Sequence, residues 1–169
     1  MISPNKIKAV LFDLDGTLRH HLPSGGEVFV KYVRSLGANF SEEDRIRSDH
    51  WEHQYFASSP EVQADNQKFK DDLKAFWVNF AIRRLVALGL HATQANKLAP
   101  KISDYMDTSY KPEVHVPEDA HTLLAALHEA GYILGVVSNR DDPFQEELEK
   151  SKAEFLFPFC ACGRGGEIL

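Results

Sequence analysis

Two carboxylates lie two residues apart, Asp13 and Asp15, in the stretch FDLDGTL that ends at Leu18. A carboxylate so placed can attack an electrophilic phosphorus once a cation offsets the charge of both groups. A second carboxylate nearby can protonate the leaving oxygen and then take a proton from water. Gly16 allows a sharp turn whose amide N–H groups face phosphate oxygens. The pattern therefore indicates phosphoryl chemistry, although Asp and Gly also favour simple turns.

The elements around these residues predict an edge where such side chains would gather. Residues 7–12, directly before Asp13, are apolar except for Lys8 and are typical of a strand buried on both faces. Residues 132–137 repeat this pattern and end at Ser138 and Asn139. Parallel strands place their carboxyl ends at one edge of a sheet, so we expect both polar ends to lie there.

Further elements complete an α/β pattern. Pro117 begins a predicted helix that Gly131 ends, directly before the second strand. Asp142 and Pro143 begin another predicted helix that runs to about residue 152, and residues 154–162 are predicted to form a third strand. The order of elements predicts an α/β fold with a parallel sheet.

Residues 19–112 differ in character, with helical periodicity and no convincing strand. Ser41 and Asp44 form a capping box. A long helix that ends near Gly89 is predicted to bury one face, formed by Phe69, Leu73, Phe76, Trp77 and Phe80. Hinges are expected at residues 23–26 and 111–112. We therefore predict one unit made of residues 1–18 and 113–169, and a helical insertion at residues 19–112.

The stretch FDLDGTL resembles motif I of the haloacid dehalogenase (HAD) superfamily, whose members are mostly phosphatases. The stretch VVSNR, which contains Ser138 and Asn139, is similar to motif II of that superfamily. The resemblance implies that Asp13 is a nucleophile that forms an aspartyl-phosphate, that Asp15 is the general acid and base, and that Thr17 orients Asp15. It also implies that Ser138 binds a phosphate oxygen and that Asn139 supports this loop.

The resemblance extends to fold, cofactor and substrate. It implies a Rossmann-like parallel sheet with a helical cap of the C1 type, as in phosphoglycolate-phosphatase-like members. Mg²⁺ would bind the Asp13 carboxylate and the Asp15 backbone carbonyl. The substrate would be a small phosphomonoester. The lysine of motif III and the acidic residue of motif IV have no counterpart in the chain, so we expect an N-terminal portion of such an enzyme with little or no turnover.

Two alternatives follow from the same residues. The absence of motifs III and IV supports a non-catalytic binding or assembly module of the same origin. A 2-haloacid dehalogenase would use Asp13 to displace halide without a metal, but that branch usually lacks the second Asp, so Asp15 argues against it. The resemblance also implies that residues 7–12 form a central strand, one edge of which has no partner strand in this chain. We therefore expect the chain to be marginally stable, to self-associate or to need a partner along this edge.

Composition restricts the partners. The chain has 169 residues, with 19 basic and 25 acidic side chains and a net charge of −6. Because it has no Lys/Arg run, nucleic acid is disfavoured, whereas a small charged substrate is compatible with the composition. The resemblance described above implies that this partner is a small phosphorylated molecule. The 43% apolar content, including 11 Phe, can form a core. We found no signal-peptide or membrane-spanning segment and expect a cytoplasmic location.

Two histidine pairs and two cysteines are weaker candidates for chemistry. The pairs His20–His21 and His50–His53 could each offer two nitrogens to a metal. Neither pair has further ligands at a recognisable spacing, so solvated histidines are the expected interpretation. Cys160 and Cys162, the chain's two cysteines, do not form a disulfide framework.

Overall fold

The structure, a computed structural model, describes residues 7–57, 59–138 and the backbone of residues 159–162. The chain divides into two compact units, Met1–Leu22 with Glu113–Leu169 and Pro23–Pro112. We call these the α/β unit and the helical unit. The first boundary falls at Leu22 rather than at the predicted Leu18, because a short strand pair described below belongs to the α/β unit.

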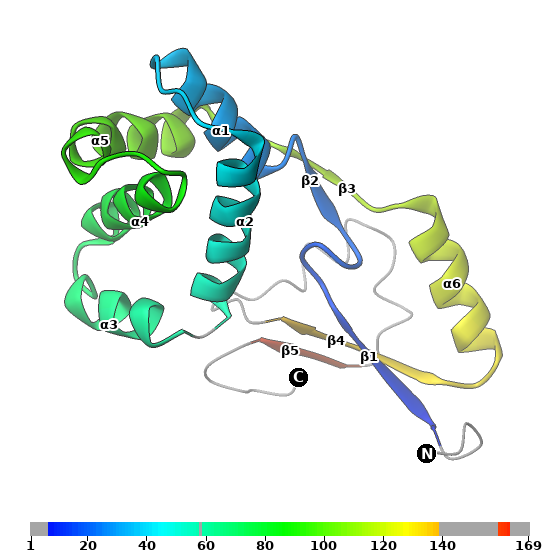
Figure 1. Cartoon of the computed structure of the whole chain (residues 1–169). Coiled ribbons are helices and arrows are strands. Elements are labelled where there is room, and N and C mark those ends of the chain that lie inside the picture. The colour runs from blue at the N-terminus through cyan, green and yellow to red at the C-terminus, as the bar shows by residue number, and fades with distance from the viewer. Residues whose placement is uncertain (1–6, 58, 139–158, 163–169) are drawn as a thin grey trace. The chain divides into compact units, whose positions relative to one another are not determined.

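The α/β unit contains a sheet of three strands, β1 (Ala9–Asp13), β4 (Ile133–Ser138) and β5 (Phe159–Cys162), in the order β1-β4-β5 (Figure 1). Neighbouring strands are parallel, and Asp13 lies beside Val137 in the register. The parallel α/β sheet predicted from the apolar stretches is therefore confirmed.

One face of this sheet forms the core of the unit. Helix α6 (Glu118–Glu129) packs Leu124 against the buried side chains of Leu134 and Val136. The opposite face carries Leu11, which is 57% exposed. The expectation that residues 7–12 are buried on both faces is thus wrong, because side chains alternate across a strand and α6 covers one face.

A second, smaller sheet was missed by the sequence analysis. Strand β2 (His20–Leu22) pairs antiparallel with β3 (Glu113–His115), with His20 opposite His115. The prediction that residues 19–112 contain no strand is therefore wrong at β2. Strands of three residues without apolar alternation leave no recognisable pattern, because their pairing uses backbone groups.

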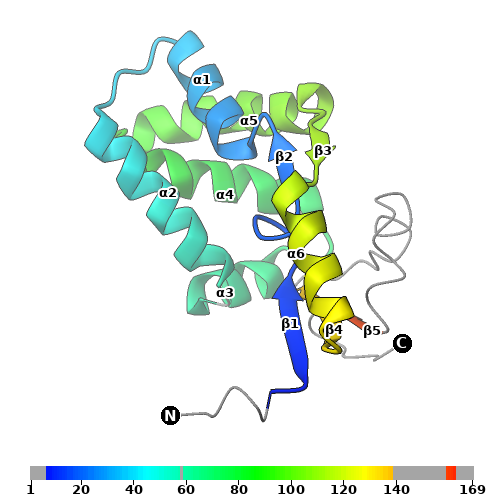
Figure 2. The ribbon, with the colours of Figure 1, turned by 90° about the vertical axis from the view of Figure 1, so that its right-hand side faces the viewer.

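The helical unit consists, in its described part, of helices that pack around one another (Figure 2). They are α1 (Gly25–Ser35), α2 (Glu42–Phe56), α3 (Pro60–Lys68), α4 (Leu73–Ala87) and α5 (Ala92–Ser109). The predicted capping box at the start of α2 is present, since the Ser41 hydroxyl accepts from the Asp44 amide and Asp44 accepts from the Ser41 amide. Ser24 and Glu27 form a second box at the start of α1.

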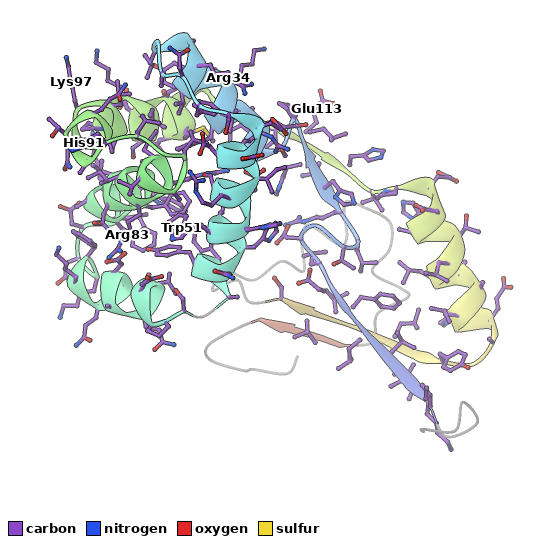
Figure 3. The ribbon with its side chains drawn as sticks, viewed as in Figure 1. Arg34, Trp51, Arg83, His91, Lys97 and Glu113 are labelled. Carbon is purple, nitrogen blue, oxygen red and sulfur yellow. The ribbon has the colours of Figure 1, made fainter. Side chains whose placement is uncertain are left out.

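Helix α4 differs from the predicted long helix at its start. Asp72 caps α4 by accepting from the Ala75 amide, so the helix begins at Leu73, and Phe69 instead ends α3. Trp51 reaches from α2 toward α4 (Figure 3), and its ring centre lies 5.8 Å from that of Phe80. Of the face predicted to be buried, Phe76 and Phe80 lie in a core cluster with Tyr55 of α2, whereas Leu73 and Trp77 are 69% and 43% exposed, so the prediction is wrong at these two positions.

Some predicted elements fall on residues that are not described. The helix expected from Asp142 to about residue 152, and the start of the third strand before Phe159, lie outside the described residues. Within the described part of the chain, no helix has the length and apolar content that a membrane crossing needs.

Candidate active site

The segment after β1 forms a tight loop. The Leu14 carbonyl accepts hydrogen bonds from the amides of Thr17, Leu18 and Arg19, at 3.4, 3.0 and 3.1 Å. Gly16 has a φ of +85°, a backbone conformation that an L side chain rarely adopts, and its amide donates to the Arg19 carbonyl at 2.8 Å. The glycine of the motif is therefore needed for the turn itself.

Within residues 13–18, the apolar side chains are buried and the polar side chains are exposed. Leu14 and Leu18 are buried in the core of the α/β unit, 1% and 7% exposed. Asp13, Asp15 and Thr17 alternate with them and are exposed. Burial of the two leucines fixes the loop and directs the polar side chains to the surface, where a substrate can reach them.

Thr17 contacts a different carboxylate from the one that we expected. Its hydroxyl donates to Asp13 Oδ2 at 3.0 Å, whereas the resemblance implied that Thr17 orients Asp15. The difference follows from the turn, because the Thr17 amide bonds back to Leu14 and brings the side chain toward the end of β1. In this structure Thr17 therefore orients the candidate nucleophile.

Asp15 is held by a residue that the sequence analysis did not select. Arg19 Nε donates to Asp15 Oδ1 at 2.8 Å, and the Arg19 side chain is only 7% exposed. An acidic residue followed four positions later by a basic one is the sequence pattern that could have indicated this ion pair. A buried guanidinium restricts the rotamers of the carboxylate, so Arg19 positions the candidate acid and base.

Ser138 lies close to Asp13 through the sheet register. Asp13 is paired with Val137, so Ser138 follows at the carboxyl end of the neighbouring strand. Ser138 is buried, 2% exposed. The sequence expectation that motifs I and II meet at one edge therefore agrees with the backbone, while Asn139 lies outside the described residues.

The loop offers oxygen donors suited to a hard cation. The exposed Asp13 carboxylate and the Asp15 backbone carbonyl are the ligand types that Mg²⁺ takes, together with waters and substrate phosphate oxygens. Among the described residues, no three His, Cys, Asp or Glu side chains gather to hold a metal, which includes both histidine pairs considered above. The donor set fits a cation that shares its ligands with substrate.

A parallel α/β sheet with an aspartate at the tip of β1, and a helical unit inserted soon after it in the sequence, define a Rossmann-like α/β fold with an insertion. The profile of haloacid dehalogenase-like hydrolases matches residues 7–164, and the chain belongs to this family. The sequence resemblance to this superfamily is thereby confirmed.

One solved structure agrees with this chain at the level of fold. A predicted phosphoglycolate phosphatase from Haemophilus somnus is 20% identical, with a TM-score of 0.50 over 98% of this chain and 67% of that chain. A 2-haloacid dehalogenase from Pseudomonas syringae is also 20% identical, with a TM-score of 0.36 over 93% of this chain and 64% of that one. The chain thus spans about two thirds of the length of both structures. No curated protein matches the sequence.

Proposed function

We propose that this chain carries the nucleophile and the phosphate-binding serine of a Mg²⁺-dependent phosphatase that hydrolyses a small phosphomonoester. The observation that carries the proposal is the position of Asp13 and Ser138 at the carboxyl ends of neighbouring parallel strands, where the register pairs Asp13 with Val137. Family membership supports the hydrolase class. The phosphatase neighbour, at 20% identity, is consistent with the substrate class.

The first step would form an aspartyl-phosphate. An Asp13 carboxylate oxygen attacks phosphorus, the bond between phosphorus and the leaving oxygen breaks, and the proton of Asp15 passes to that oxygen. Thr17 holds the other Asp13 oxygen, which fixes the attacking geometry. The Ser138 hydroxyl would donate to a non-bridging phosphate oxygen.

The second step would regenerate the enzyme. Water gives a proton to Asp15 and attacks phosphorus, and the bond between phosphorus and the Asp13 oxygen breaks to release inorganic phosphate. Mg²⁺, held by the Asp13 carboxylate and the Asp15 carbonyl, would supply charge that offsets the phosphate and the nucleophile. Arg19 keeps Asp15 beside the reacting groups between the two proton transfers.

The test is magnesium-dependent phosphate release from p-nitrophenyl phosphate by the full product of the gene. Asp13→Asn should lower kcat by more than about a thousandfold, because an amide is a poor nucleophile. Asp71→Asn is the matched control, since Asp71 is an exposed carboxylate of the helical unit. Undiminished turnover in Asp13→Asn would contradict the assigned nucleophile, and magnesium-independent halide release would favour a dehalogenase.

A further inference from the structure

The helical unit contains a cavity that the proposed phosphatase chemistry does not use. It has a volume of about 720 Å³ and lies among α1, α2, α4 and α5. Buried Phe29, Phe80 and Ile102 form part of its lining. All of its lining residues belong to the helical unit, and its volume is in the range of small-molecule sites.

Large apolar side chains are exposed around this cavity. Trp77 is 43% exposed, Phe56 38% and Leu73 69%, and all three line the cavity. The Trp77 ring meets Phe80 edge-on, with ring centres 5.6 Å apart, and lies 6.3 Å from the Phe56 ring. Apolar side chains exposed together around a hollow are typical of a binding site, because such exposure is costly without a ligand.

Arg84, a cation in the lining of the cavity, already has carboxylate partners within the helical unit. Arg84 is 2% exposed; its guanidinium donates to Glu52 at 2.7 Å and to Asp49 at 3.4 Å, and it stacks 4.3 Å from the centre of the Phe29 ring. The cation is therefore already neutralised from within the unit. An incoming anion would have to displace one of these carboxylates.

Glu52 is more accessible than the arginine that it binds. Its side chain is 28% exposed, and the bond to Arg84 engages Oε1. Burial raises the pKa of Glu52 even beside Arg84, because removal from water disfavours the charged form of the carboxyl. Asp104 and Asp107 of α5 add negative charge to the lining, against the exposed Lys74 of α4.

We propose that this cavity binds an organic ammonium ion, with its apolar or aromatic body against Phe56 and Trp77 and its charged nitrogen at Glu52. Aromatic faces attract a cation in addition to apolar groups, so both parts of such a ligand are accommodated. A carboxylate and aromatic rings around one cavity form a recognised arrangement for amines. The proposal does not depend on the phosphatase activity of the α/β unit.

A charge series on the intact chain tests the proposal directly. The probes are 2-phenylethylammonium, neutral 2-phenylethanol and anionic 3-phenylpropanoate, which share a similar body and differ in charge. Affinity is measured by calorimetry, and the indole N–H signal of Trp77 reports the site by NMR. We expect the ammonium to bind about tenfold more tightly than the alcohol, and the anion most weakly, because a charge-assisted hydrogen bond is worth about this factor.

Variants assign the preference to Glu52. Glu52→Gln should reduce the affinity for the ammonium to that for the alcohol. The affinity for the alcohol should stay the same, because the Gln side chain can still accept a hydrogen bond from Arg84. Glu43→Gln, on the same helix and outside this cavity, removes the same charge and should change nothing. Trp77→Leu should weaken all three probes.

Three results would overturn the proposal. One is equal binding of the three probes, or tightest binding of the anion, to the wild-type chain; this comparison needs no variant to fold. Another is a folded Glu52→Gln chain that keeps its preference for the ammonium. The third is no shift of the Trp77 signal with the ammonium up to about 10 mM, a concentration that would reveal even weak specific binding.

Discussion

Removal of Glu52 and removal of Arg84 from their ion pair should change the free energy of unfolding by different amounts. Arg84 lies on α4 and is 2% exposed, whereas the side chains of Glu52 and Asp49 on α2 are 28% and 30% exposed. The pair therefore connects the two helices through a buried cation and two partly hydrated anions. We expect removal of an acid to cost more stability than removal of the base.

The magnitudes follow from what each change leaves behind. Glu52→Ala leaves a buried guanidinium with Asp49, 3.4 Å away, and should cost about 3 kcal/mol, the lower end for breaking a buried pair. Arg84→Met removes the buried cation, keeps apolar volume and lets both carboxylates regain water, so about 1–2 kcal/mol is expected, mainly from the lost contact with Phe29. Glu52→Gln keeps the acceptor for Arg84 and should cost less than about 1 kcal/mol.

The assay is urea unfolding at neutral pH, followed by tryptophan fluorescence. Both tryptophans, Trp51 and Trp77, belong to the helical unit, so the signal reports the unfolding of that unit. Glu43→Ala, an exposed change on α2, is the control and should stay within about 0.5 kcal/mol. If Arg84→Met destabilises more than Glu52→Ala, the reasoning from burial is refuted.

The stability of the helical unit should also depend on pH through Glu52. Burial raises the pKa of Glu52 above its ordinary 4.5, so the folded state binds this proton more tightly than the unfolded state does. Protonation of Glu52 therefore adds stability as the pH falls from above the folded pKa toward 4.5, and Glu52→Gln lacks this change. The free energy of unfolding of the wild type should rise relative to that of Glu52→Gln over this window, and a difference that stays constant as the pH falls to 4.5 would contradict it.

Three further predictions concern other parts of the chain. Hydrogen bonds from Ser41 lower the pKa of Asp44 to about 2. The stability that the Asp44 charge contributes is therefore complete above pH 3.8 and is lost as the pH falls toward 2. The difference in unfolding free energy between the wild type and Asp44→Asn should shrink over that range. Leu85 is fully buried, and Leu85→Ala should lower the free energy of unfolding in urea by about 3 kcal/mol. A loss below about 1 kcal/mol would contradict tight packing around Leu85. β1 ends the described sheet, so we expect concentration-dependent sedimentation, and slow hydrogen exchange at Leu11 in a strictly monomeric sample would argue against association through this edge.

The elements that the sequence predicted are those whose signals are local. The apolar stretches gave β1 and β4, and the capping box of Ser41 and Asp44 marked the start of α2, because strand burial and cap hydrogen bonds involve neighbouring residues. Pairing of β2 with β3 was not predictable, because it joins segments on either side of the whole helical unit through backbone bonds. The early end of α3 at Phe69 was missed because the apolar spacing continues across it.

The site divides in the same way. The candidates Asp13, Asp15 and Ser138 follow from motifs at the ends of predicted strands. The bond from Thr17 to Asp13 depends on a turn whose shape the motif does not specify. The contact of Arg84 with Glu52 joins residues 32 positions apart on two helices, so only the packing of α2 on α4 reveals it.

The loop after β1 shows why its motif is so compact. Leu14 and Leu18 are buried, so the positions between them must face outward, and the chemistry is confined to alternate residues. Arg19 extends this arrangement, because its buried guanidinium holds Asp15 while its backbone carbonyl accepts from Gly16. Residues 13–19 therefore supply the candidate carboxylates, the anchors that fix the turn and the cation that holds Asp15. A change at Leu14 or Leu18 should disturb Asp13 and Asp15 together, since these leucines anchor the hydrogen-bonded turn in the core. The same turn carries Thr17 and Arg19, which hold the two carboxylates.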